Sequence, residues 1–278
     1  MSKLTQRHEP ARAVEEVEDM IEPAVPERLG WLAGLLDPHP GQRIVDLGCG
    51  TGAMLAVLAE AARVELVGLD LSAAALRAAA RALQAGSDGA WLLVQADLGR
   101  AIPLADQSVD RVLSHNVLEC LPDPAALLEE VTRVLRPGGR LVLSHTDFDT
   151  LVFSSEDHAL TRRLVHAYSD TQQEWMAAVD GTIGRRLPDL VVRSPLQVDA
   201  VEAKAVVSRR WAPGELGYGY AHNLVDALTR AQAADPDELA AWLQGLARLS
   251  ERDAFLFSLN DYAVVATRPT PSRVGISR

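Results

Sequence analysis

The sequence has few aromatic residues, little positive charge and no long apolar run. Aromatic residues fill only 5% of the 278 positions, and 27 basic side chains are outnumbered by 38 acidic ones, which gives a formal net charge of −11. An acidic surface repels phosphate backbones, so this composition disfavours a nucleic-acid partner. Because no apolar stretch approaches the roughly 20 residues of a membrane span, we expect no transmembrane segment.

Cysteine is also scarce. The two cysteines, Cys49 and Cys120, cannot form the disulfide framework of a small secreted domain, and free thiols fit a reducing compartment. The first twenty residues are charged and lack the apolar core of a signal peptide. We therefore expect a cytoplasmic protein. The histidines show no metal-ligand spacing, so we expect no metal site. The sequence does not indicate an oligomeric state.

Between residues 43 and 146, short apolar segments alternate with segments of helical periodicity. The segments 43–48 and 64–70 are apolar almost throughout, whereas the segment 51–62 between them places apolar residues on one face. Strands of this kind, separated by helices, predict a parallel sheet that is covered on both faces. The expected fold class is therefore α/β and Rossmann-like, with helices on both faces of the sheet.

After residue 149 the alternation loosens, and helical stretches lie between two further strands. In the N-terminal region, apolar residues recur at helical spacing in Ala11–Ile21 and Pro26–Leu36, which predicts two helices. We expect a single domain, because the late helical stretches interrupt one sheet. Its expected parts are an N-terminal helical lid (1–42), a cofactor-binding half (43–149), helical cap insertions (150–195 and 211–251) and the last strands (196–210 and 252–268).

The segment VDLGCGTG (45–52) places three glycines, Gly48, Gly50 and Gly52, where the first predicted strand turns into a helix. Ligands of open parallel sheets bind beyond the carboxyl ends of the strands. Glycine permits a positive φ there and lets a ligand lie against bare backbone, and the helix start offers unpaired N–H groups. An ordinary turn needs one glycine, so three of them predict a ligand-binding loop.

Two kinds of adenosyl ligand fit this loop. Residues 48–53 satisfy the G-x-G-x-x-G/A pattern of dinucleotide sites, and Asp70 ends the next strand where a ribose-binding acid belongs. Asp46, however, would oppose a pyrophosphate and suit a ligand that carries an ammonium and a sulfonium. Asp97 follows the third strand, where its carboxylate can accept a hydrogen bond from an adenine amino group.

With LRPGGRLVL (135–143) added, these motifs resemble those of class I S-adenosylmethionine-dependent methyltransferases. The resemblance is strongest to the branch that includes ubiquinone/menaquinone-biosynthesis and natural-product methyltransferases. It implies a seven-stranded, mostly parallel sheet whose antiparallel last strand is AFLFSLNDYAVVATR (254–268). It also implies S-adenosylmethionine as cofactor and S-adenosylhomocysteine as product. The matching segments, all within residues 43–146, are VDLGCGTG, LVGLDLS, QADLGRAIPLADQSVDRVLSHNVLECLPDP and LRPGGRLVLS.

The resemblance also implies which residues bind the cofactor. Asp46 would hold the amino end, Asp70 would take the ribose hydroxyls and Asp97 would recognise the adenine edge. The residues expected around the methionine part and the methyl group are Asp46, Gly48, Gly50, Gly52 and Asn116. The residues expected around the ribose and the adenine are Asp70, Leu71, Asp97 and Leu98.

Methyl transfer from a sulfonium is an in-line displacement, so positioning supplies much of the acceleration. A general base is needed only if the nucleophile keeps its proton until late in the reaction. His145, at the end of the fifth strand, is the preferred base or substrate-orienting group, because imidazole titrates near neutrality. Further candidates are Tyr218, Tyr220 and His222 in the segment YGYAHN, and His115 and Glu119 after the fourth strand.

The expected function is methyl transfer to a small aromatic or apolar metabolite, on nitrogen, oxygen or carbon, in specialised metabolism. Trp175, Trp211, Phe148 and Phe153 are expected near the acceptor, because aromatic walls suit a flat molecule and stabilise a sulfonium by cation–π contact. Trp31 belongs to the helical lid that would close over the cofactor. Two alternatives stay open: an NAD(P)-dependent oxidoreductase and a non-catalytic cofactor-binding relative.

Overall fold

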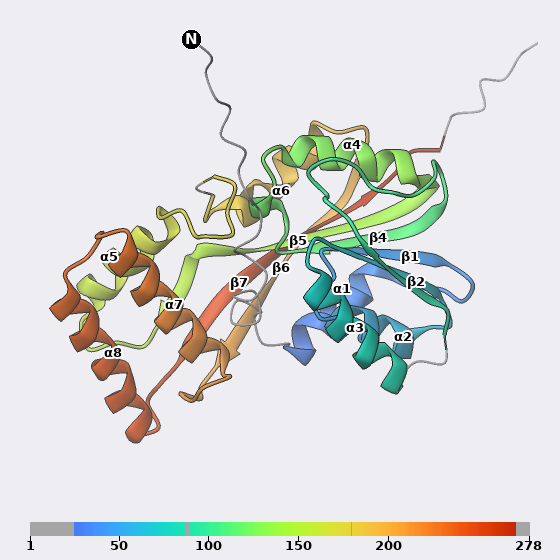
Figure 1. The fold of residues 1–278 in the computed structure, drawn as a ribbon. Helices are drawn as coiled ribbons and strands as arrows, with labels where there is room; N and C mark the ends of the chain where they lie inside the picture. The colour runs from blue at the N-terminus through green and yellow to red at the C-terminus, as the bar shows by residue number, and fades with distance from the viewer. Residues whose placement is uncertain (1–24, 87–88, 179, 271–278) are drawn as a thin grey trace, which may run out of the picture.

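The protein is built on one seven-stranded sheet with the strand order β3-β2-β1-β4-β5-β7-β6 (Figure 1). The computed structural model describes residues 25–86, 89–178 and 180–270, so the predicted helix Ala11–Ile21 lies outside the described residues. β1 to β5 are parallel, and β7 runs antiparallel to both β5 and β6. The predicted Rossmann-like sheet with an antiparallel last strand is confirmed.

Each strand and helix of the regular alternation falls on a segment whose periodicity predicted it. The strands are β1 (Arg43–Leu47), β2 (Glu65–Asp70), β3 (Trp91–Gln95), β4 (Val109–His115), β5 (Leu135–Phe153), β6 (Gln197–Ser208) and β7 (Phe257–Thr267). The helices are α1 (Pro26–Leu36), α2 (Ala53–Ala61), α3 (Ala73–Gly86), α4 (Pro124–Val134), α5 (His158–Ser169), α6 (Ile183–Val192), α7 (Leu216–Arg230) and α8 (Pro236–Glu251).

Two of these helices begin at an Asp-Pro pair. Asp123 and Asp235 are the N-caps of α4 and α8, and each carboxylate accepts hydrogen bonds from backbone N–H groups of the first turn. Proline follows at the first helical position, where its missing N–H costs nothing. These two Asp-Pro pairs therefore stabilise the starts of α4 and α8.

The central strands are buried on both faces, which explains why they are apolar throughout. On one face, Val45 and Leu47 of β1 belong to a core that α4 and α6 cover. On the other face, Ile44 belongs to a core formed with α1, α2 and α3. Figure 1 shows α4 and α6 above the sheet and the other three helices below it. Because side chains alternate between the two faces of a strand, consecutive residues of β1 are buried in different cores.

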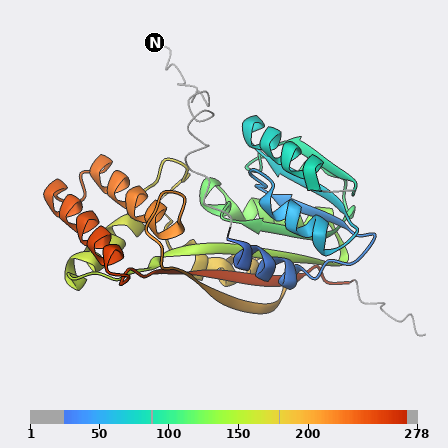
Figure 2. The same cartoon turned by 90° about the horizontal axis from the view of Figure 1, so that it is seen from below.

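β5 is much longer than the other strands of the sheet. It runs over 19 residues, and Phe148, Leu151 and Phe153 at its far end enter a separate apolar core with α5, α7 and α8. These three helices are called the cap below. Figure 2 shows the long strands running from the sheet half into the cap. The pairing of β5 with β7 is interrupted between Asp147 and Val152, which frees the intervening residues from a regular register.

Two local expectations differ from the structure. Pro137, Gly138 and Gly139 in the sequence predict a turn that ends a helix before the fifth strand begins. They form instead an insertion within β5, because Leu135 pairs with Val109 and the regular register resumes only at Arg140. α6, expected in the cap, packs instead on the sheet against β5, β6 and β7, with Leu187 fully buried there. The apolar face of this short helix packs against the sheet and α4.

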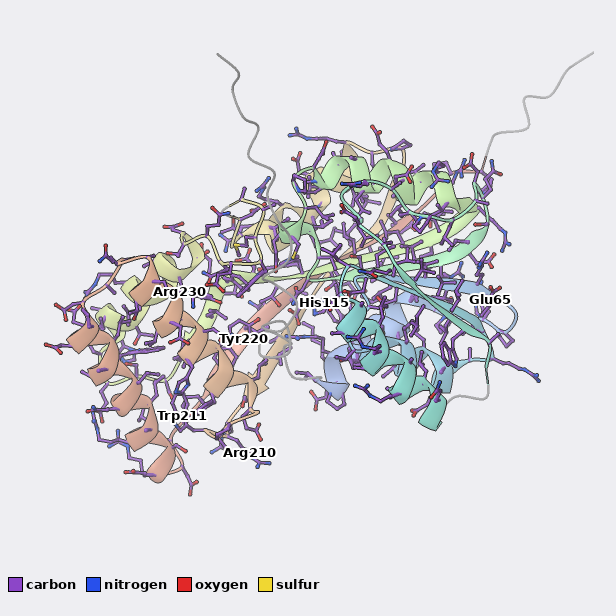
Figure 3. All side chains as sticks on the ribbon, in the orientation of Figure 1. Glu65, His115, Arg210, Trp211, Tyr220 and Arg230 are labelled. Carbon is purple, nitrogen blue, oxygen red and sulfur yellow. The ribbon has the colours of Figure 1, made fainter. Side chains whose placement is uncertain are left out.

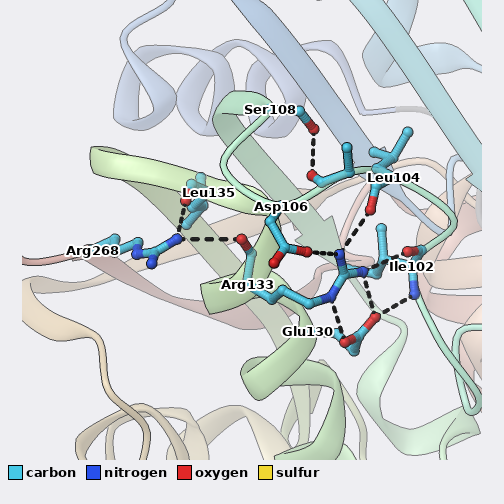
Figure 4. A network of polar contacts seen from close by, with 9 residues as sticks. Ile102, Leu104, Asp106, Ser108, Glu130, Arg133, Leu135 and Arg268 are labelled. Carbon is cyan, nitrogen blue, oxygen red and sulfur yellow. Dashed lines mark hydrogen bonds and ion pairs between the residues drawn. The ribbon is translucent and has the colours of Figure 1, made fainter.

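The long connection between β3 and β4 is tied down by a single arginine of α4 (Figure 4). The guanidinium of Arg133 donates to the carbonyl oxygens of Ile102 and Leu104, each at 2.8 Å, and to the carboxylates of Asp106 and Glu130. Five donors in a fixed fork suit such a set of planar acceptors. The Arg133 network therefore orders a segment that has no secondary structure of its own.

No described helix is long and apolar enough to cross a membrane.

Candidate active site

A cleft of about 630 Å³ opens at the carboxyl ends of β1 and β4, facing the cap. One wall comes from the glycine loop and β4, and the opposite wall comes from α5 and α7, with α1 at one side. Figure 3 labels a residue from each wall, His115 at the end of β4 and Tyr220 on α7. Lining residues used below are Arg28, Asp46, Gly48, Gly50, His115, Asn116, Glu119, Phe148, Tyr168, Trp175 and Tyr220.

The three glycines of the loop have separate roles. All have positive φ, at +73° for Gly48, +51° for Gly50 and +84° for Gly52. A Cβ on Gly48 would lie 2.3 Å from Val117, and one on Gly52 would lie 2.8 Å from the Cβ of Ala79 on α3. A Cβ on Gly50 would meet no heavy atom within 4 Å. Gly50 is therefore the glycine whose bare backbone faces open space in the cleft, whereas Gly52 allows close packing against α3.

This difference gives a matched pair of substitutions. We expect Gly52→Ala to lower the free energy of unfolding by about 1–3 kcal/mol, because it combines overpacking with a left-handed backbone. Gly50→Ala is strained by φ alone, so its cost in stability is smaller, but its methyl group enters the cleft and weakens binding of S-adenosylhomocysteine. Urea unfolding and calorimetry on both variants measure the two effects. Equal losses of stability would contradict the assignment.

Asp46 is the buried acid of the cleft. Its side chain is 3% exposed, and burial, reinforced by the neighbouring Asp70 carboxylate, raises its pKa to about 7. Among the described residues, no positive charge offsets the effect of burial and of Asp70 on the Asp46 carboxylate. The site therefore favours a ligand that brings a cation next to Asp46.

The residues predicted to bind the adenosyl part of the cofactor lie along the same edge of the sheet, at the ends of β2 and β3. Asp70 accepts the backbone N–H groups of Gly50 and Ser72, each at 2.8 Å, and so holds the glycine loop in place. Asp97 accepts from Gly99 N at 3.0 Å and pairs with Arg100. Asp70, Leu71, Asp97 and Leu98 lie outside the cleft lining that the described residues form. Leu71 is 65% exposed, whereas Leu98 is buried in the core.

Asn116 connects the cleft to a buried polar network. It follows β4 with a φ of +54°, and its Oδ1 accepts the backbone N–H of Thr146 at 2.9 Å. The Thr146 hydroxyl donates to Asp261 Oδ1 at 2.6 Å, and Arg28 Nε donates to Asp261 Oδ2 at 2.6 Å. Arg28 is 3% exposed and Asp261 is fully buried. This network fastens α1 to β5 and β7, and it brings Arg28 into the cleft wall.

His145 does not line the cleft. It is buried on β5, where its Nε2 forms an ion pair with Glu119 Oε2 and its Nδ1 lies 2.7 Å from the carbonyl oxygen of Thr146. Burial opposes the charged ring, but the Glu119 carboxylate outweighs it and raises the pKa of His145. The other Glu119 oxygen accepts the indole N–H of Trp175 at 3.1 Å. His145 thus contacts Glu119, which in turn holds the indole of Trp175 in the cleft wall.

The segment YGYAHN divides between two surfaces of α7. Tyr220 lines the cleft and stacks on Phe257 with ring centroids 5.5 Å apart. Tyr218 and His222 stack on each other at 3.9 Å, outside the cleft, in a cluster with Trp211. Of the three candidates Tyr218, Tyr220 and His222, the structure therefore brings Tyr220 alone to the cleft, where Gly219 and Asn223 of the same segment also lie.

The expected aromatic residues divide in the same way. Phe148 and Trp175 line the cleft, together with Tyr168 of α5, which the sequence analysis did not single out. Phe153 packs on Trp242 inside the cap, at a centroid distance of 5.1 Å. Trp31 donates to Glu202 of β6 at 3.4 Å, away from the cleft. Among the described residues, no group of three or more His, Cys, Asp or Glu side chains could hold a metal ion.

The comparisons with known proteins agree with this architecture. Residues 45–143 match the family model described as "Methyltransferase domain". The chain is 32% identical over 202 residues to a 37.1 kDa protein encoded in transposon TN4556 of Streptomyces fradiae, covering 66% of this chain and 56% of that protein. It is 40% identical over 116 residues to a methyltransferase of Mycobacterium ulcerans, covering 42% of this chain and 44% of that one. The chain spans about half the length of these curated relatives.

A solved structure with the same fold is phosphoethanolamine N-methyltransferase 2 of Haemonchus contortus, bound to phosphomonomethylethanolamine and S-adenosylhomocysteine. The TM-score is 0.55 at 16% identity, over 90% of this chain and 54% of that one. The fold and the family match make residues 45–143 similar to a Rossmann-like methyltransferase domain. S-adenosylmethionine is the cofactor that this similarity supports.

Proposed function

We propose that the protein transfers the methyl group of S-adenosylmethionine to a small molecule held between the glycine loop and the cap. The observation that carries this proposal is the single cleft that joins Asp46 and Gly50, on the cofactor side, to Phe148 and Tyr220, on the cap side. Donor and acceptor bound in one cleft can reach the near-attack geometry from which an in-line displacement gains most of its rate.

The residues on the cofactor side fit the proposed ligand. Asp46 is a buried acid without a cation, and the ammonium group of the cofactor would supply one. Gly50 leaves open space at the loop, and the exposed Leu71 offers an apolar surface for the adenine. We further propose that Asp70 binds the ribose and Asp97 the adenine amino group, since both carboxylates stand at the carboxyl edge of neighbouring strands.

The cap side fits a compact, partly aromatic acceptor. Phe148, Tyr168, Trp175 and Tyr220 supply the ring surfaces of the cleft. Small-molecule sites are mostly apolar with a few placed polar groups, which is the composition of this wall. The Haemonchus contortus enzyme is also bound to a small molecule, which supports a small-molecule acceptor but not its aromatic character. A role in specialised metabolism belongs to the same proposal, as do an N-terminal lid formed around α1 and a substrate role for the cap.

Ligand binding separates this function from its alternatives. We expect S-adenosylhomocysteine to bind in isothermal titration calorimetry with a dissociation constant in the micromolar range, about −8 kcal/mol. NADH and NADPH are expected not to bind, because Asp46 opposes a pyrophosphate at the glycine loop. Binding of a nicotinamide nucleotide alone would favour an oxidoreductase. Binding of S-adenosylhomocysteine without methyl transfer to any acceptor in a labelled-cofactor screen would favour a non-catalytic relative.

A further inference from the structure

β6 is the longer of the two edge strands of the sheet, and its outer side pairs with no other described strand. The sheet ends with β6 on one side and β3 on the other, and β6 runs over 12 residues whereas β3 runs over 5. Figure 2 shows β6 at the margin of the sheet. An edge of this length is a template for pairing with another strand. β6 contains no proline that would block such pairing, and its bulge lies near one end, between Val198 and Ala200.

The central seven residues of β6, AVEAKAV (200–206), are chemically symmetric about Ala203. Glu202 and Lys204, one residue from this centre on either side, carry opposite charges, and the residues two and three positions away are alanine or valine. In an antiparallel pair of identical strands centred on Ala203, Glu202 of each copy lies opposite Lys204 of the other. A lysine in an edge strand ordinarily discourages pairing, but here each lysine would meet a glutamate.

Both charges are available for such a partner. Within the part of the chain that the structure describes, neither Glu202 nor Lys204 has an ion-pair partner, and Glu202 only accepts the neutral indole N–H of Trp31 at 3.4 Å. Lys204 is opposite Asp261 in the register with β7, but both carboxylate oxygens of Asp261 are already taken by the buried network described above. The charges of β6 therefore complement a second copy of β6.

The opposite face of β6 exposes apolar side chains. Val201 is 51% exposed and Val207 is 58% exposed, and Ala203 and Ala205 between them are exposed as well. Residues two apart share one face of a strand, so these side chains form one row. In the same antiparallel pair, Val201 of one copy lies opposite Ala205 of the other, and Ala203 meets Ala203. Pairing would thus cover apolar surface on this face and join opposite charges on the other.

We propose that the protein forms a homodimer in which β6 pairs antiparallel with β6 of a second copy, centred on Ala203. The contact is isologous and closed, so assembly stops at two copies, and the two sheets become one continuous sheet. The charges also fix the register, because a centre at Glu202 or Lys204 would place like charges directly opposite each other. No residue of β6 belongs to the described cleft lining, so the dimer does not depend on the proposed function.

Two charge reversals test the proposal by sedimentation velocity over a dilution series. We expect the wild type to sediment at twice the chain mass of 30.0 kDa and to dissociate only on dilution. Glu202→Lys and Lys204→Glu each place like charges opposite each other at two symmetric positions. Each is therefore expected to raise the dissociation constant of the dimer about 10- to 100-fold.

Mixing the two variants gives the sharpest readout. An equimolar mixture of Glu202→Lys and Lys204→Glu restores both opposite-charge pairs, so it should form a heterodimer with close to wild-type affinity. The double variant, in which the two charges are exchanged within one chain, should dimerise like the wild type. Arg230→Glu makes the same change of charge on α7, outside β6, and is expected to leave the dimer unchanged. Far-ultraviolet circular dichroism checks that each variant is folded.

The outcomes separate this interface from any other occupant of β6. A wild type that stays monomeric at every concentration would overturn the proposal, whatever else covers the strand. A dimer that both reversals leave unchanged would place the interface elsewhere, and so would a mixture that associates no better than either variant alone. S-adenosylhomocysteine should bind all variants equally in calorimetry. If it does not bind the wild type, the proposed function fails while the dimer stands.

Discussion

Asp261→Ala is expected to lower the free energy of unfolding by about 3–5 kcal/mol, the cost of leaving a buried charge without its partner. Arg28 is 3% exposed, and its guanidinium bonds to the fully buried Asp261 carboxylate. The same substitution removes the acceptor of the Thr146 hydroxyl, which would then keep only the long contact from Asn116 Nδ2 at 3.4 Å. Urea unfolding followed by tryptophan fluorescence measures the loss.

The matched control is Glu65→Ala. Glu65 also pairs with an arginine, Arg43 at 3.1 Å, but its side chain is 49% exposed. Exposed ion pairs contribute at most about 1 kcal/mol, so this variant should unfold close to the wild type. A second variant, Arg28→Met combined with Asp261→Leu, should recover much of the lost stability, because it leaves no unpaired charge. If Asp261→Ala and Glu65→Ala unfold at the same urea concentration, the buried pair does not fasten α1 as described.

The affinity for S-adenosylhomocysteine is expected to fall about tenfold between pH 8 and pH 6, because protonation of Asp46 competes with binding. In the free site the pKa of Asp46 is about 7. A bound ammonium group favours the carboxylate and lowers that pKa, so binding releases a proton when the pH is near or below 7. The affinity therefore rises with pH and levels off above pH 8. Calorimetry in two buffers with different ionisation enthalpies measures the proton release directly.

Asp46→Asn removes both effects at once. It should weaken binding at pH 8 by about 10- to 100-fold, in line with the roughly 1.5–3 kcal/mol of a hydrogen bond to a charged group. Its affinity should then be flat between pH 6 and pH 8. Asp226→Asn, an exposed acid on α7, should keep the wild-type slope. A pH slope that survives in Asp46→Asn would mean that another group binds or releases the proton.

The regular half of the fold could be predicted from the sequence because the signals there are local. Apolar runs followed by amphipathic helices define β1 to β4, and the Asp-Pro pairs mark the starts of α4 and α8. The carboxyl ends of neighbouring parallel strands must meet at one edge, so the glycine loop, Asp70 and Asp97 could be grouped before any coordinates. Their roles toward the cofactor stay predictions.

The candidate catalytic residues were harder to predict, since they depend on which way a side chain points. Helical periodicity puts residues four apart on one face and residues two apart on nearly opposite faces. Tyr218 and His222 therefore stack together outside the cleft while Tyr220 faces it, and this spacing was visible in the sequence. The Arg28–Asp261 pair joins residues 233 positions apart and has no local signal. The placement of His145 beside Glu119 likewise depends on how β5 meets the segment after β4.

The length of β5 constrains how an acceptor can enter. The same unbroken strand contributes Leu141 and Leu143 to the core under α4 and Phe148 and Phe153 to the cap core. A clamshell movement of the cap would have to bend this strand and its neighbour β7, and no glycine interrupts β5 between Arg140 and Phe153. Any change in access to the cleft is therefore expected in lining segments outside the sheet, such as the turn bearing Trp175 and the connection before α7. Movement of these loops at the rim of the cleft would then limit turnover, while the core under α4 and the cap core keep their relative positions.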